Sequence, residues 1–211
     1  MYIPKDFLVT DREQIASFMQ MNNFATLVSW DGERPVASHL LFEVATDDRN
    51  ELTLNCHMAR ANDQWRTFQP DKEVLAIFGG AHTYISPRWY SHTGNVPTWN
   101  YQAVHAYGMP QVVNDPDELY EILTRLVDRY ESNSGANPEY HLDSLPKELI
   151  LEKMKGIVGL RIRLTRVEAK FKLSQNRSQP ERENIVIELG KRGDENSSRI
   201  AAAMTETERR L

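Results

Sequence analysis

Residues 79–108 read GGAHTYISPRWYSHTGNVPTWNYQAVHAYG, and this stretch concentrates planar side chains. It holds two of the four tryptophans, four of the eight tyrosines and three of the six histidines of the chain. Aromatic faces stack on flat molecules and imidazoles donate hydrogen bonds, so the composition favours a surface that holds a flat or anionic ligand. A strand-rich core beside an aromatic loop explains the same composition equally well.

The end of this stretch has the pattern of a strand with two unlike faces. Side chains alternate along a strand, so one face carries Trp99, Tyr101, Ala103, His105, Tyr107 and Met109. The opposite face carries Asn100, Gln102, Val104, Ala106 and Gly108. The first face suits a ligand wall or a subunit interface, and the second suits close packing against another backbone.

Most of the chain reads as strands connected by hairpins. Runs rich in β-forming residues occupy 24–30, 35–42, 51–57, 73–79, 82–86, 102–113, 157–164 and 167–173. Asp31-Gly32 indicates a hairpin, and Gly79-Gly80 separates two of the expected strands. Short helices are expected at 59–68 and 147–155, and residues 116–131 form the clearest amphipathic helix. The pattern predicts a mainly β, α+β fold, a β-barrel with peripheral helices.

The C-terminal part differs from the rest in its low density of large apolar residues. Residues 1–180 are expected to form one domain that includes the inserted helices, and residues 181–211 a helical extension. A helix with few apolar groups is weak by itself, because most helical stability comes from packing. We expect this extension to dock on a partner or to fray.

Composition limits the location and the partners of the protein. The chain has 211 residues, a formal net charge of −5 and one cysteine, Cys56, which fits a reducing compartment. No apolar run approaches the roughly 20 residues that cross a bilayer, and no signal peptide is evident. We therefore expect a cytoplasmic protein that is not bound to a membrane. A basic run at 161–182 is interpreted as a solvated strand edge or, less simply, as a phosphate-binding surface.

Residue spacing argues against metal and nucleophile chemistry and favours an anion site. The histidines lack zinc-site spacing, so no metal is expected, and a single cysteine on a strand is usually an inert small hydrophobe. Residues 55–66 run from a strand into an expected helix start, where free amides attract anions. His57, Arg60 and Asn62 can add side-chain donors there. The alternative is that Asn62 or Asp63 only caps the helix.

Several separated motifs resemble the PaiB family of FMN-binding proteins. They are MYIPKDF at 1–7, NDQWRTF at 62–68, YISPRWY at 84–90, VPTWNYQAVH at 96–105 and KFKLSQN at 170–176. The resemblance implies an FMN-binding split β-barrel, in which two identical subunits hold the flavin between them. It also implies FMN as the cofactor and a homodimer as the assembly.

The resemblance assigns roles to eleven residues. Ser38, His39 and Leu40 would run beside the isoalloxazine ring, and Asn55, His57, Arg60 and Asn62 would lie where the FMN phosphate binds. Trp99 and Tyr101 would reach the flavin or the dimer seam. Lys170 and Lys172 would contact the flavin of the partner chain.

The family is described as negative transcriptional regulators of protease production and sporulation. The resemblance thus implies repression, with DNA contacted directly or indirectly, although the sequence shows no helix-turn-helix. A flavin-dependent oxidoreductase is the alternative, with His39 or His105 as proton donors. A haem-binding or haem-degrading protein is a third reading. The catalytic residues are unknown from the sequence, and whether the protein is an enzyme stays open.

Overall fold

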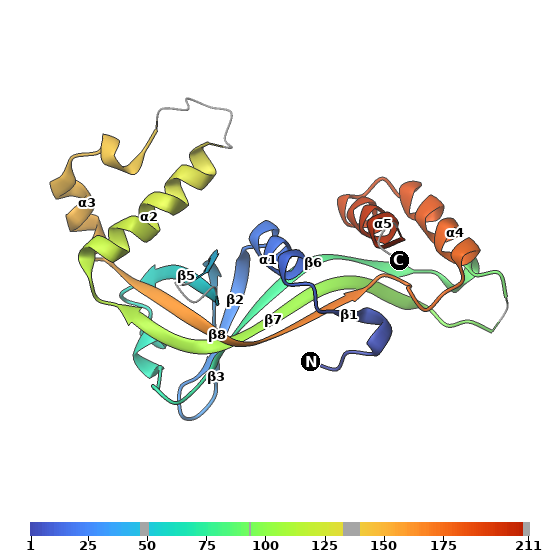
Figure 1. Cartoon of the computed structure of the whole chain (residues 1–211), viewed down its shortest axis with the longest axis horizontal. Helices are drawn as coiled ribbons and strands as arrows, with labels where there is room; N and C mark the ends of the chain where they lie inside the picture. Colours follow the sequence, from blue (N-terminus) through green and yellow to red (C-terminus); the bar gives the residue numbers. More distant parts are fainter. Residues whose placement is uncertain (47–50, 93, 133–139, 209–211) are drawn as a thin grey trace. The chain divides into compact units, whose positions relative to one another are not determined.

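The computed structural model describes residues 1–46, 51–92, 94–132 and 140–208 (Figure 1). Its helices are α1 (Arg12–Met21), α2 (Pro116–Glu131), α3 (Lys147–Met154), α4 (Gln179–Gly190) and α5 (Glu195–Glu208). Its strands are β1 (Leu8–Val9), β2 (Phe24–Trp30), β3 (Pro35–Leu41), β4 (Glu43–Thr46), β5 (Leu52–Ala59), β6 (Val74–Ile85), β7 (Thr98–Val113) and β8 (Ile157–Lys172). Short 3-10 helices are η1 (Lys5–Phe7), η2 (Asp63–Thr67), η3 (Pro87–Trp89) and η4 (Leu142–Ser144). The expected mainly β, α+β class is confirmed.

The strands form one sheet in the order β3-β2-β6-β7-β8-β5-β4, and β1 pairs with β8. The pairs whose register is described are antiparallel. The expected hairpin joins β2 to β3 and places Thr26 opposite His39. Its turn uses Gly32 at φ +106°, a conformation that favours glycine, while the Asp31 carboxylate accepts the amides of Glu33 and Arg34.

Two expected breaks between strands are wrong. β6 runs without interruption through Gly79-Gly80, and neither glycine has the positive φ that a turn there would use. Gly80 instead makes room for α1, because a Cβ at this position would lie 2.7 Å from the Phe18 ring. β8 likewise runs through 164–167 as one strand of 16 residues. It pairs on both sides, so the interpretation of 161–182 as a strand edge is also wrong.

The chain divides into two compact units, and β6, β7 and β8 contribute residues to both. Unit 1 comprises Met1–Phe18, Phe78–His105 and Glu168–Leu211, and unit 2 comprises Met19–Ile77 and Ala106–Val167. These units are defined by contacts and do not test the expected division into a domain at 1–180 and an extension at 181–211, which stays a prediction.

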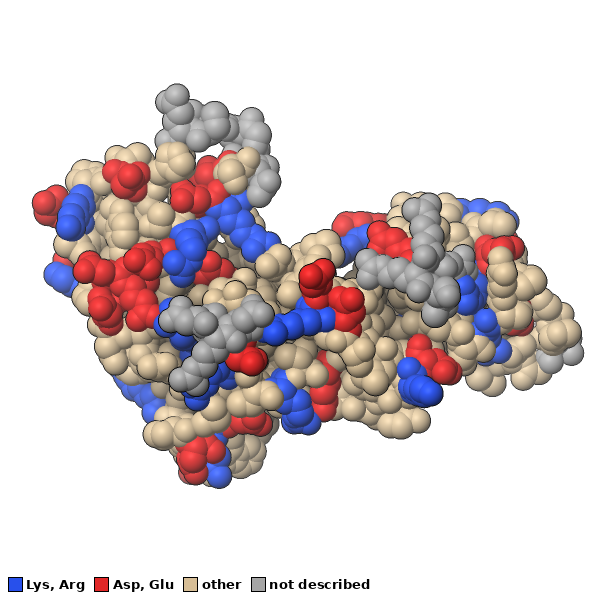
Figure 2. All heavy atoms as spheres, in the orientation of Figure 1, with Lys and Arg blue, Asp and Glu red and all other residues tan. Residues whose placement is uncertain are grey.

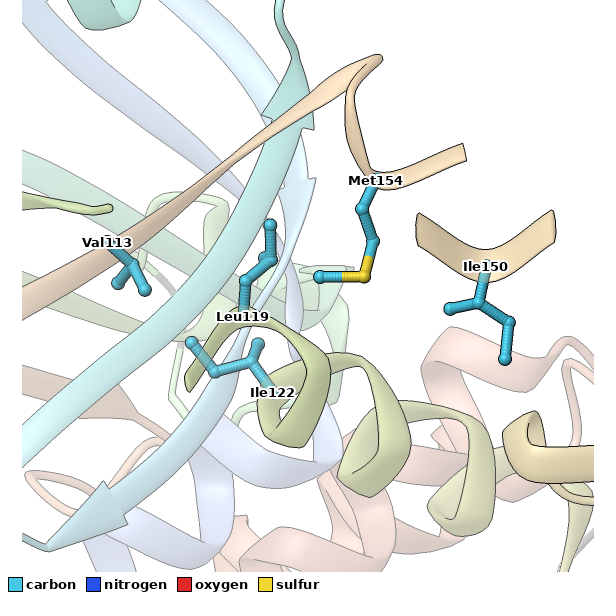
Figure 3. Close-up of a cluster of buried hydrophobic side chains, with 5 residues drawn as sticks. All are labelled: Val113, Leu119, Ile122, Ile150 and Met154. Carbon is cyan, nitrogen blue, oxygen red and sulfur yellow. The ribbon is translucent and has the colours of Figure 1, made fainter. Parts of the chain in front are cut away.

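In unit 2, α2 and α3 enclose a small apolar core with the end of β7. Its buried members are Val113, Leu119, Ile122, Ile150 and Met154 (Figure 3). α2 begins where the sequence predicts: the Asp115 carboxylate accepts the amide of Asp117 at 2.9 Å, and Pro116 occupies the first turn. The helical hairpin is therefore fixed to the sheet by its apolar face.

In unit 1, the C-terminal tail forms two helices that pack on the sheet, so the expectation of a single weak helix that docks on a partner or frays is wrong. Figure 1 shows α4 and α5 beside each other over the ends of β6 and β7. Ile185, Leu189 and Ile200 are fully buried. The Thr83 and Ser197 hydroxyls lie 3.0 Å apart, and Asn100 Nδ2 donates to Ser174 Oγ at 3.0 Å. Few large apolar residues suffice because polar contacts complete the packing.

Gly108 marks the closest backbone approach in unit 2. A Cβ on Gly108 would lie 2.4 Å from the Arg163 carbonyl oxygen and 2.8 Å from Ile162 Cγ2. Real Cβ atoms do not approach backbone so closely, so β7 and β8 require glycine here. The small strand face that the sequence indicated serves this close packing.

We therefore expect Gly108→Ala to lower the free energy of unfolding by about 3 kcal/mol, at the upper end of the cost of overpacking, because a backbone atom cannot move aside easily. Chemical denaturation followed by circular dichroism measures the change. Gly79→Ala is the matched control, because a Cβ there meets no atom within 4 Å. Equal denaturation midpoints for the two variants would contradict the role of Gly108.

Candidate functional site

The eleven residues expected to bind FMN fall into two groups. Unit 2 holds seven of them: Ser38, His39, Leu40, Asn55, His57, Arg60 and Asn62. Unit 1 holds the other four: Trp99, Tyr101, Lys170 and Lys172.

Ser38 and Asn62 lie together. Asn62 Nδ2 donates to Ser38 Oγ at 2.8 Å, and Asn62 Oδ1 accepts the amide of Gln64 at 3.0 Å. Asn62 therefore caps η2, as in the alternative in which Asn62 or Asp63 serves only as a helix cap. The expected helix over 59–68 is wrong, because β5 continues to Ala59 and only the five-residue 3-10 helix η2 follows. Because Ser38 Oγ accepts a hydrogen bond from Asn62, the hydrogen of the Ser38 hydroxyl can be donated to an anion. The short helix η2 does not supply a helix dipole for this purpose.

Gln64 fixes this corner to the sheet, and sequence reasoning missed it. Its side chain is buried, and Nε2 donates to the Leu27 and Val36 carbonyls and to Ser29 Oγ. Asn62 and Ser38 are thereby held in place by β2 and β3. A polar residue two positions after a capping asparagine is the only local signal, and by itself it does not show burial.

The three residues of β3 do not share one surface. Ser38 and Leu40 point to one side, where Leu40 is buried, and His39 points to the other. There its Nδ1 lies 3.1 Å from Thr26 Oγ1, and its ring stacks on Phe24 with centroids 6.2 Å apart. Thr26 was missed, although the hairpin register pairs it with His39.

Asn55 and Arg60 are engaged in structural contacts. Asn55 is 3% exposed and bonds to Glu43 and Arg161. Arg60 Nε and Nη2 donate to the carbonyls of Lys155 and Ile157, each at 2.8 Å. Arg60 thus satisfies carbonyls at the C-terminal end of α3, where a cation is favoured by the helix dipole. Its remaining Nη1 group is the part left to meet a phosphate.

His57 and Cys56 are neighbours on β5 with different environments. Burial lowers the pKa of the half-buried His57 below its ordinary value, so the ring is neutral at pH 7 and can donate one hydrogen bond. Burial raises the pKa of the Cys56 thiol. The thiol therefore stays protonated, which fits an unreactive core cysteine.

In unit 1, aromatic rings and two lysines share one face of the sheet, where Trp99 is exposed and Lys170 is buried. Trp99 is 52% exposed, and its ring centroid lies 6.1 Å from that of His82 and 6.2 Å from that of Tyr84. Lys170 Nζ lies 5.3 Å from the centre of the Tyr101 ring and donates to the Tyr2 carbonyl. His82 and Tyr84 were missed, although their alternation along residues 82–84 places them on one strand face.

Lys172 and His105 complete the titratable groups of this face. Lys172 donates to the Thr98 hydroxyl. Partial burial, and then the charges of Lys170 and Arg177, lower the pKa of Lys172. Burial also lowers the pKa of His105, an effect that the N-terminal ammonium reinforces and Glu168 opposes. Both groups lose charge more readily than in solution.

None of the helices within the described ranges combines the length and apolarity that crossing a membrane takes. In the part of the chain that the structure describes, no three His, Cys, Asp or Glu side chains gather as metal ligands.

Comparison with known proteins identifies the family. The profile of the family described as "Putative FMN-binding domain" matches residues 1–166. "Protease synthase and sporulation protein PAI 2" of Bacillus subtilis is 41% identical over 204 residues, covering 97% of this chain and 96% of that protein. An uncharacterized protein of Aspergillus fumigatus is 30% identical over 196 residues, covering 77% of this chain and 75% of that protein.

Solved structures are similar in fold at low sequence identity. The flavocytochrome Anf3 from Azotobacter vinelandii has a TM-score of 0.61 at 14% identity, covering 78% of this chain and 69% of that chain. The FAD and haem binding protein from Mycobacterium smegmatis has a TM-score of 0.60 at 15% identity, covering 78% and 72%. These likenesses confirm the expected split-barrel fold. The family match over residues 1–166 and the 41% identity to the Bacillus PaiB protein establish that this chain belongs to the FMN-binding domain family.

Proposed function

We propose that this protein is a homodimeric, cytoplasmic FMN-binding protein that acts as a negative regulator of transcription, of the protease and sporulation type. The observation that carries the proposal is the 41% identity over 97% of the chain to the Bacillus subtilis protein named for protease synthesis and sporulation. A buried, protonated Cys56 and the absence of a second cysteine support a reducing compartment.

The side chains present fit FMN, which has a flat apolar ring system and a phosphate dianion. Trp99 offers an exposed ring face, and the half-buried Tyr101 ring lies beside it on the strand face with the buried Lys170 over it. The Ser38 hydroxyl, the neutral His57 ring and the Nη1 group of Arg60 offer hydrogen-bond donors for phosphate oxygens. When bound, FMN would supply a ring that accepts and releases electrons. The residues that we assign would bind and orient it.

An uncovered apolar face on β2 and β3 supports the homodimer. Phe24 is 70% exposed and Trp30 is 55% exposed, and alternation puts both on the same side of β2. β3 stands at the end of the described strand order, so its outer edge pairs with no other described strand. Exposed apolar surface of this kind marks an interaction site. We assign it to a second copy of the chain.

The distribution of charged side chains supports indirect regulation of transcription, because a broad basic surface for DNA is not seen on the face drawn in Figure 2. On the face drawn in Figure 2, Lys and Arg are interspersed with Asp and Glu. The basic side chains of β8 are largely engaged: Arg161 pairs with Glu118, and Lys170 bonds to the Tyr2 carbonyl. Binding to the DNA backbone needs clustered free cations. We therefore propose that the protein regulates transcription indirectly.

FMN binding is tested by titrating the purified protein into FMN and following flavin fluorescence and the visible absorbance bands. We expect quenching by the parent chain, and about tenfold weaker binding by Trp99→Ala, because stacking on an aromatic ring contributes about 1–3 kcal/mol. Tyr140→Ala, which removes an exposed ring outside both groups, should bind FMN as the parent does. Colourless protein that leaves FMN fully fluorescent would refute the proposal. Steady NAD(P)H oxidation by the FMN-loaded protein would favour the oxidoreductase instead.

The homodimer is tested by size-exclusion chromatography with light scattering. We expect twice the chain mass of 24.4 kDa, and a dimer dissociation constant raised by about tenfold or more in Phe24→Ser, because an anchoring aromatic side chain would be lost. Val96→Ser, which alters an exposed apolar residue of unit 1, should leave the mass unchanged. A parent chain that elutes as a monomer at micromolar concentration would overturn the assignment.

Regulation is tested by deleting the gene in its host and measuring transcripts of extracellular protease genes. We expect the transcripts to rise and to return to their original level when the parent gene is restored. Unchanged transcripts would contradict a negative regulator. A gel-shift titration at stated salt then separates the two routes, because a specific complex with promoter DNA at micromolar protein would show direct rather than indirect repression.

A further inference from the structure

A cavity lies in unit 2, lined by residues of β4, β5, β7, β8 and α2. Its volume is about 880 Å³, within the range of small-molecule sites. The guanidinium groups of Arg125, Arg161 and Arg163 line it. Of the eleven residues proposed for FMN, only Asn55 takes part in this cavity.

A hydrogen-bonded network fixes two of the three arginines. Glu43 is its centre: Oε1 accepts Arg125 Nε at 2.6 Å, and Oε2 accepts Asn55 Nδ2 at 3.1 Å. Asn55 Oδ1 in turn accepts Arg161 Nε at 3.2 Å, and Arg161 Nη1 lies 2.6 Å from Glu118 of α2. The network ties α2 to the sheet and holds both guanidinium groups at the cavity wall in set orientations.

Two groups of the cavity wall have no partner among the described residues. Arg163 and Thr53 are directly opposite each other on β8 and β5. Thr53 is 4% exposed and lines the cavity, yet its hydroxyl makes no hydrogen bond within the described ranges. The Arg163 guanidinium likewise forms no ion pair or hydrogen bond there. The Thr53 hydroxyl and the exposed Arg163 guanidinium together form a donor pair that an oxyanion can use.

The charge of the lining sets the class of ligand. Arg125 pairs with Glu43 and Glu121, and Arg161 pairs with Glu118, so among the described residues Arg163 is the arginine of the lining that has no carboxylate partner. A small anionic group matches this one available cation, because guanidinium groups bind phosphate and carboxylate through paired hydrogen bonds.

We propose that this cavity binds a small organic anion, a phosphate monoester or a carboxylate, through Arg163 and Thr53 with Arg161 and Arg125 beside them. The site is separate from the proposed FMN site, because Asn55 serves here to position Arg161 and has both side-chain atoms occupied. The ligand would bridge the sheet and α2, since Arg125 belongs to that helix.

Isothermal titration calorimetry on the full chain tests this, with glycerol 3-phosphate and succinate as probes. We expect one probe to bind at one site per chain, and the tighter probe identifies the source of the anionic group. Arg163→Gln should weaken that probe by about tenfold or more, the usual effect of losing a hydrogen bond to a charged group. Thr53→Val, which keeps the shape of the side chain, should weaken it severalfold.

Arg34→Gln is the matched control, because it removes an exposed arginine of the same unit that lies outside the cavity. It should bind the probe as the parent does. Both cavity variants should still quench FMN fluorescence fully, so failure of this site is distinguishable from failure of the flavin site. The proposal is wrong if neither probe binds at millimolar concentration, if Arg163→Gln binds as tightly as Arg34→Gln, or if FMN displaces the probe.

Discussion

The backbone hydrogen bonding of three long strands supports the rest of the structure. β6 has 12 residues, and β7 and β8 have 16 each, so both compact units share them. Every other strand attaches to this set directly or through one neighbour: β2 to β6, β5 and β1 to β8, β3 to β2, and β4 to β5. Since an unpaired buried amide or carbonyl is costly, these partners are required wherever the long strands pass through a core.

The long strands also constrain which residues are permitted on them. Gly80 and Gly108 lie at ordinary extended conformations, so their role is space and not a turn. One accommodates the Phe18 ring and the other the Arg163 carbonyl oxygen. Each glycine therefore lets another element approach the strand more closely than any side chain would permit. At Gly80 the glycine makes room for a neighbouring ring and does not form a turn. The expected break in β6 at Gly79-Gly80 is therefore absent, and β8 likewise continues through 164–167.

Some arginines are bonded to other groups of the protein, and others stay available to bind an anion. Arg60 satisfies carbonyls at the end of α3, and Arg161 completes a network with Asn55 and Glu118. Arg163, on the same strand face as Arg161, has no such partner among the described residues. The residue type is the same for these three. Their different availability comes from what each guanidinium meets, and this decides where an anion can bind.

The sequence predicted local features well, because their causes are local. The Asp31-Gly32 hairpin, the start of α2 at Asp115 and Pro116, and the two unlike faces of β7 all follow from neighbouring residues. The fold class followed from the strand pattern and from motifs that resemble one family. The continuity of β6 and β8 did not follow, since glycine signals a turn in the sequence whether or not a ring fills the space above it. The second C-terminal helix was missed for a similar reason, because its polar contacts are with distant residues.

For the candidate sites, the sequence by itself determined which residue types were present and which strand face each would take. It placed donors at 55–62 and exposed rings at 99–101, and the solvent-facing Trp99 matches the face assigned to it. Only the tertiary structure decided that Asn55 and Arg60 are engaged, that Asn62 caps η2 and that Thr53 stands opposite Arg163. The physical reason is that alternation along a strand is a local property. The partner that satisfies a buried polar group comes from whichever strand or helix the fold brings beside it.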